Sequence, residues 1–199
     1  MNGHPPTGTE IEIERPAPGS HRTTVVVDGR GVDTLADLPP LRDRLLFVGL
    51  HPSAASVEAG HYHQDPGGRT FWEHLVRATI LPAGTAAERA DDALLAAGHG
   101  ITDLLKDPAR DEVRGPTFRS GVGALWQKVA IWRPAAVVFI DRRGAEAAAG
   151  RPVEEKWGQL VGVALSGRPC FLMPARNAPA EEVDEGLNLL RNLAASLPG

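Results

Sequence analysis

The sequence has a single cysteine, Cys170, among 199 residues. One cysteine excludes an intramolecular disulfide framework, and it also excludes a zinc or iron–sulfur site that needs several thiolate ligands. Long hydrophobic runs are missing too, since no apolar stretch approaches the ~20 residues that a membrane-spanning helix requires. We therefore expect a protein of the reducing cytoplasm that has no membrane partner.

The chain also lacks an excess of positive charge. Its formal net charge is -4 and its pI is about 6.0, so no global basic field indicates a nucleic-acid partner, and any polyanion must be held by a local patch. Neither a GxGxxG nor a P-loop sequence is present, which disfavours a nucleotide-binding or phosphate-binding α/β protein. With 42% hydrophobic residues, the length suits one soluble domain around one core.

The N-terminal part of the chain differs in composition from the rest. Residues 1–22 are rich in Pro, Gly, Thr and Glu without apolar periodicity, so we expect a flexible tail followed by a single domain at 23–199. The segment "EIEIE" within this tail offers an alternative, a strand at a sheet edge. Asp28-Gly29 separates two β-prone runs and predicts a hairpin.

Nearly continuous apolar runs alternate with helical patterns along the remaining chain. Such runs are typical of parallel strands that are covered on both faces. We predict strands at 44–50, 135–141, 160–165 and 168–174, and helices at 70–80, 85–97, 117–132 and 179–196. Thr85 and Glu88 have capping-box spacing, and leucines form one stripe on the last helix. The pattern predicts an α/β three-layer sandwich with a central, mostly parallel four-stranded sheet flanked by helices.

Two loops follow strands of this predicted sheet, and each contains a proline that stiffens the turn. They read "GLHPSAAS" at 49–56 and "MPARNAP" at 173–179. Ligands of open α/β sheets bind at the carboxyl ends of the strands, where such loops converge. These two loops are therefore the expected site.

Three segments resemble the uracil-DNA glycosylase superfamily, and its mismatch-specific uracil/thymine-DNA glycosylase branch in particular. They are "LLFVGLHPSAASVEAGHYHQDPGGRTFWEHL", "GHGITDLLKDP" and "MPARNAP", in that order and spacing. The resemblance implies hydrolysis of the N-glycosidic bond of uracil or a related deaminated or mismatched base, which is flipped out of DNA into a pocket. It further implies DNA as the partner, a monomer, and neither a metal nor any other cofactor.

The resemblance also assigns roles to individual residues. The first motif supplies His51 as the catalytic residue, and Gly49, Leu50 and Pro52 as substrate-binding residues. Tyr62 or His63 corresponds to the aromatic residue that stacks on the base. The second motif supplies the loop that wedges into the minor groove, namely Pro174, Ala175, Arg176 and Asn177.

His51 stands where the branch has an asparagine, and Ala175, Arg176 and Asn177 replace small hydroxyl residues. An imidazole can orient or deprotonate water, or attack the anomeric carbon directly. The alternative for His51 is a histidine that only bonds to backbone at a strand end. For the whole protein, the alternative is a catalytically weak module of the same fold that binds lesions or single-stranded DNA without cleavage.

Other polar residues near these motifs invite simpler interpretations. His51, His61 and His63 suggest a metal triad, but they lack regular ligand spacing, so we expect no metal on this loop. Thr102 and Asp103 in "GHGITDLLK" are expected to bond to local backbone, and we assign them no chemistry.

Overall fold

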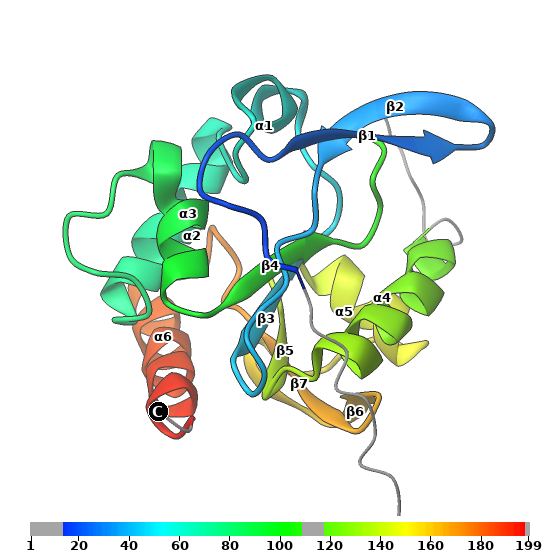
Figure 1. Cartoon of the computed structure of the whole chain (residues 1–199). Coiled ribbons are helices and arrows are strands. Elements are labelled where there is room, and N and C mark those ends of the chain that lie inside the picture. The colour runs from blue at the N-terminus through cyan, green and yellow to red at the C-terminus, as the bar shows by residue number, and fades with distance from the viewer. Residues whose placement is uncertain (1–13, 109–117, 198–199) are drawn as a thin grey trace, which may run out of the picture.

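The computed structural model describes residues 14–108 and 118–197, and its centre is a five-stranded sheet in the order β4-β3-β5-β7-β6 (Figure 1). The first four strands of this order are parallel, and β6 pairs antiparallel with β7. The strands are β3 (Leu45–Gly49), β4 (Gly100–Asp103), β5 (Ala136–Phe139), β6 (Gly158–Leu165) and β7 (Arg168–Leu172).

Helices cover both faces of this sheet (Figure 1). They are α1 (Ala54–Ala59), α2 (Pro66–Arg77), α3 (Ala90–Ala96), α4 (Phe118–Trp132), α5 (Arg142–Ala149) and α6 (Ala180–Ala195), with a short 3-10 turn η1 (Ala87–Arg89) before α3. Alternate residues of β3 face opposite layers: Phe47 packs in the core with α2, α3 and α6, whereas Val48 packs in the core with α4 and α5. The predicted three-layer α/β sandwich is confirmed.

The sheet has one strand more than the four that we predicted. The additional strand, β4, has only four residues, "GITD", and a continuous apolar run is absent from it. Two short helices, α1 and α5, were not predicted either. The prediction of a capping box at Thr85 is wrong. The Thr85 hydroxyl donates to Pro82 O at 2.8 Å, and η1 begins after Ala86 without a side-chain cap.

The hairpin prediction is confirmed. Strands β1 (Arg22–Val27) and β2 (Arg30–Leu35) pair antiparallel and form a two-stranded sheet of their own. The turn residues Asp28 and Gly29 have φ angles of 50° and 76°, as a two-residue turn with both φ angles positive requires.

Two residues of the expected tail, Arg15 and His21, contact the domain. Arg15 donates hydrogen bonds to Pro39 O at 2.9 Å and to Leu95 O at 2.8 Å, and His21 is buried. These contacts fix the chain on the domain before β1 begins. Residues 1–13, with most of "EIEIE", lie outside the described residues. Within the described chain, no helix is long and apolar enough to cross a bilayer.

Candidate functional site

A cavity of about 930 Å³ lies at the carboxyl ends of the central strands. Both predicted loops line it, so His51 and Pro174 lie at the same edge of the sheet, as expected. The structure brings all of the predicted site residues to this cavity, namely Gly49, Leu50, His51, Pro52, Tyr62, His63, Pro174, Ala175, Arg176 and Asn177. Their individual roles stay predictions.

The loop after β3 is held by its neighbour in the sheet. The amides of Leu104 and Leu105 donate to Gly49 O at 2.9 Å and to Leu50 O at 2.8 Å, which continues the parallel pairing past the end of β4. Gly49 has no room for a side chain, because a Cβ there would collide with a carboxylate oxygen of Asp103. The absence of a side chain at Gly49 thus lets Asp103 approach the loop that carries His51.

Asp103 is the residue that sequence reasoning missed. It ends β4, lines the cavity, and is 3% exposed. Its buried Oδ2 has no hydrogen-bond partner among the described residues. Burial raises the pKa of Asp103 to about 6, against the opposing charge of Lys106. A buried carboxylate oxygen that lacks a donor indicates a missing ligand or water. The available sequence signal was an acid at the end of a short apolar segment.

A charged network beneath the cavity fixes the end of β4. Asp37 accepts from the Thr102 hydroxyl at 2.5 Å, and it pairs with Lys106 at 2.6 Å and with Lys128 at 2.7 Å. Burial alone would raise the pKa of Asp37, but these two lysines lower it to about 2. Thr102 therefore bonds mainly to a distant side chain, and its contact with local backbone, Asp103 O at 3.3 Å, is the longer one.

His63 is the second side chain with an unsatisfied polar atom at the cavity. Its Nε2 is buried without a partner among the described residues. Burial lowers the pKa of His63 to about 4, against the charge of Asp65, so the imidazole is neutral at neutral pH. The ring packs against Phe71 with centroids 4.6 Å apart. A flat, neutral ring in this position suits contact with a base.

Tyr62, the other candidate for stacking, is tied into the wall of the cavity. It is 1% exposed, and its hydroxyl donates to Ala36 O at 2.9 Å. Its carbonyl accepts from Trp72 Nε1 at 3.1 Å. Burial raises the pKa of Tyr62 well above its ordinary range, so the phenol stays protonated. The structure therefore gives Tyr62 a role in the core as well as a place at the cavity.

Basic and acidic side chains both line the cavity: Asp65 and Asp141 accompany the arginines and the lysine there, and Arg143 pairs with Asp141. Arg176 is exposed and lies against Gly67 in the first turn of α2, where any side chain would collide with its guanidinium. Arg142, Arg143 and Lys156 also line the cavity. The N-termini of α2 and α5 open onto the same space, which adds partial positive charge. The cationic side chains and the two helix N-termini can thus attract an anionic group to the cavity.

A mostly parallel sheet with a cavity of this size at its carboxyl edge defines an α/β protein that binds its ligand at the ends of the strands. The chain belongs to the uracil DNA glycosylase superfamily: the model of the family described as "Uracil DNA glycosylase superfamily" matches residues 36–177. This span contains every predicted site residue and Asp103 as well. The search of curated proteins finds no match to the chain.

Proposed function

We propose that this protein is a monofunctional DNA glycosylase of base excision repair, close to the mismatch-specific branch, which hydrolyses the N-glycosidic bond of uracil or a related deaminated base. One observation carries the proposal beyond family membership: the carboxylate of Asp103, which has an oxygen without a donor among the described residues, lines the same cavity as His51. The proposed substrate is a base flipped out of DNA, and the protein acts as a monomer with no cofactor taking part in the reaction.

A carboxylate is a hydrogen-bond acceptor only, and this property supports selection of deaminated bases. Uracil presents an N–H where cytosine presents a bare ring nitrogen, and hypoxanthine differs from adenine in the same way. The carboxylate of Asp103 would therefore accept a hydrogen bond from uracil or hypoxanthine, and it would face a lone pair in cytosine or adenine. An unpaired buried acceptor penalises the wrong base strongly.

His51 takes the main chemical role in this proposal. As the C1′–N bond breaks, its electron pair leaves on the base, and the sugar becomes cationic. The oxygen of a water molecule bonds to C1′ while the imidazole of His51 accepts the proton of that water. Direct attack by an imidazole nitrogen on C1′, followed by hydrolysis of the adduct, is the alternative course. The position of His51, on the loop next to the buried Asp103, supports its role in either course.

The basic side chains that line the cavity would hold the DNA backbone while the base enters. Arg176 projects from the exposed loop at 174–177, so we assign this loop to the gap that the flipped base leaves. His63 or Tyr62 would contact the face of the base, where stacking contributes ~1–3 kcal/mol in single-strand-binding proteins.

The decisive experiment measures base release. Labelled oligonucleotides that carry uracil, hypoxanthine, xanthine or thymine opposite each normal base are incubated with the protein, and abasic sites are scored after alkali treatment. Release of uracil or hypoxanthine, with cytosine and adenine left intact, supports the proposal. Lesion binding without release from any substrate favours the second candidate, a binding module, which the histidine at position 51 and the acidic net charge motivate.

A further inference from the structure

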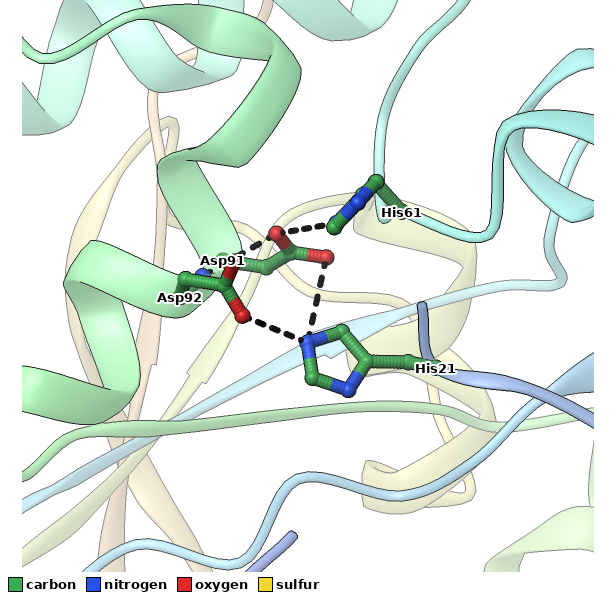
Figure 2. Close-up of side chains that lie close together, drawn as sticks. All are labelled: His21, His61, Asp91 and Asp92. Carbon is green, nitrogen blue, oxygen red and sulfur yellow. Dashed lines mark hydrogen bonds and ion pairs between the residues drawn. The ribbon is translucent and has the colours of Figure 1, made fainter. Parts of the chain in front are cut away.

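A second histidine–aspartate group lies outside the cavity (Figure 2). We call it the HD cluster; it consists of His21, His61, Asp91 and Asp92. His61 Nδ1 lies 2.9 Å from Asp91 Oδ1, and His21 Nε2 lies 3.0 Å from Asp92 Oδ1 and 3.9 Å from Asp91 Oδ2. One ligand atom from each of the four residues lies within 4.8 Å of all the others. The cluster joins three segments that are distant in the sequence.

These distances suit a tetrahedral metal ion. Zinc binds imidazole nitrogen and carboxylate oxygen at ~2.0–2.2 Å, which places neighbouring ligand atoms ~3.4 Å apart. The three separations between imidazole nitrogen and carboxylate oxygen given above range from 2.9 to 3.9 Å and therefore bracket this value. Only a small adjustment of the side chains separates the cluster from a coordination sphere of two histidines and two aspartates.

The charge balance of the HD cluster also favours a bound cation. The side chain of Asp91 is 0% exposed, and its ion-pair partners among the described residues are His21 and His61. Arg89 lies 2.7 Å from Asp92, so its positive charge balances the carboxylate of Asp92 and not that of Asp91. An ionised aspartate without a cation is costly to bury. A divalent cation held between the four side chains would lie next to the buried carboxylate of Asp91 and balance its charge.

Further hydrogen bonds orient the ligands from outside. The Tyr62 amide donates to Asp91 Oδ2 at 2.9 Å, and the Gly19 amide donates to Asp92 Oδ1 at 3.0 Å. Bonds of this kind fix the carboxylates of metal sites. The side chains of His61 and Asp92 are 11% and 12% exposed, so the cluster is open to solvent on one side and an ion can enter.

We propose that the HD cluster binds a divalent transition-metal ion, with zinc as the best match to its ligands. The ion would clamp the segment before β1 and the loop at 60–64 onto α3. Tyr62 and His63 follow His61 directly, so the clamp would also fix the wall of the cavity. This proposal is independent of the glycosylase proposal, because its first test is metal binding.

The test uses the full chain after treatment with a chelator and removal of that chelator. Zinc chloride is titrated by calorimetry, cobalt(II) is titrated by visible absorption, and thermal unfolding is followed in both states. We expect one zinc ion per chain, the strong absorption of tetrahedral cobalt, and a rise in Tm of ~5–10 °C at a zinc concentration 100 times the Kd. Absence of saturable binding, or a Tm that zinc leaves unchanged, would overturn the proposal.

Variants then locate the ion. Asp92→Asn and His61→Gln should each weaken zinc binding at least ~10-fold, since the loss of a ligand costs no less than the loss of an outer partner. Asp184→Asn is the matched control, because Asp184 pairs with Arg77 on the surface and should leave the Kd unchanged. Equal affinity of Asp92→Asn and wild type would place the ion elsewhere, at His51 for instance, and would also overturn the assignment.

Discussion

The cavity and the HD cluster both combine histidine with aspartate, and they lie on either side of the loop at 60–64. In the cavity, Asp103 Oδ2 and His63 Nε2 are buried without partners among the described residues. In the HD cluster, both aspartates are paired with histidines, and backbone amides complete their hydrogen bonds. The polar groups at the cavity can therefore bond to a bound molecule, whereas those of the HD cluster already bond to one another and tie three segments of the chain together.

This contrast predicts that changes in the cavity alter chemistry and changes around the HD cluster alter stability. The largest expected effect is that of His51→Ala, which should lower the rate of base release ~100- to 10,000-fold, because it removes the group that accepts a proton from water. Single-turnover rates on a uracil duplex measure it. Lesion binding and Tm should stay close to wild type, since His51 lies at the cavity and outside the core.

His51→Asn serves as the matched variant, because it restores the side chain usual in the mismatch-specific branch. Partial recovery of base release would support water activation. A protein–DNA adduct that resists denaturation in wild type, and is absent from His51→Ala, would support covalent attack instead. Full activity of the alanine variant would return His51 to the interpretation as a loop residue bonded to backbone.

Asp103→Asn should lower the rate of base release and raise the stability of the protein. Loss of a charged acceptor should lower base release ~10- to 100-fold, since hydrogen bonds to charged groups contribute about 1.5–3 kcal/mol. The same change should raise the free energy of unfolding by about 1–3 kcal/mol at pH 8, because it removes a buried charge whose pKa is raised to about 6. Rate measurements and denaturant titrations at several pH values check both effects.

The pH dependence of that stability difference follows from the direction of the pKa shift. The folded state holds a proton on Asp103 more tightly than the unfolded chain does, so wild type gains stability as the pH falls through about 6. The advantage of Asp103→Asn should therefore shrink between pH 8 and pH 4. The rate of wild type should fall over the same range as the carboxylate takes up its proton. A pH-independent difference would show that Asp103 acts through packing alone.

The sequence predicted the strands and loops that form the cavity better than it predicted the chemistry of the cavity. Apolar runs identified β3, β5 and β7, and the rule that ligands bind at the carboxyl edge brought His51 and Arg176 to one cavity. Asp103 was missed because β4 has only four residues, and because a pKa shift depends on burial that the local sequence does not encode. The HD cluster was missed for a similar reason: His21 and Asp91 are far apart in the chain, and only the fold brings them together.

Tyr62→Phe tests the loop at 60–64, which lies between the cavity and the HD cluster. The Tyr62 hydroxyl donates to Ala36 O, so its removal leaves a part-buried carbonyl without this donor and should lower the free energy of unfolding by about 1 kcal/mol. Base release should change less than twofold, because a phenylalanine ring keeps the same face toward the cavity. Chemical denaturation and the oligonucleotide assay measure the two quantities. A large loss of activity at unchanged stability would instead assign the hydroxyl to the substrate.

The smallest expected effect is that of Arg176→Ala on DNA binding. Arg176 is exposed at the mouth of the cavity, and an exposed charge contributes about 1 kcal/mol or less, so affinity for a lesion-containing duplex should fall up to ~5-fold. Affinity for undamaged duplex should fall less, because only a flipped base leaves the gap that this side chain fills.

Binding titrations on both duplexes at one salt concentration measure the difference, with Arg69→Ala as a matched arginine outside the cavity lining. Equal losses on the two duplexes would make Arg176 an ordinary phosphate contact. Unequal losses would assign the loop at 174–177 to recognition of the flipped state, and would make the cavity mouth part of the lesion-binding site together with the buried acid.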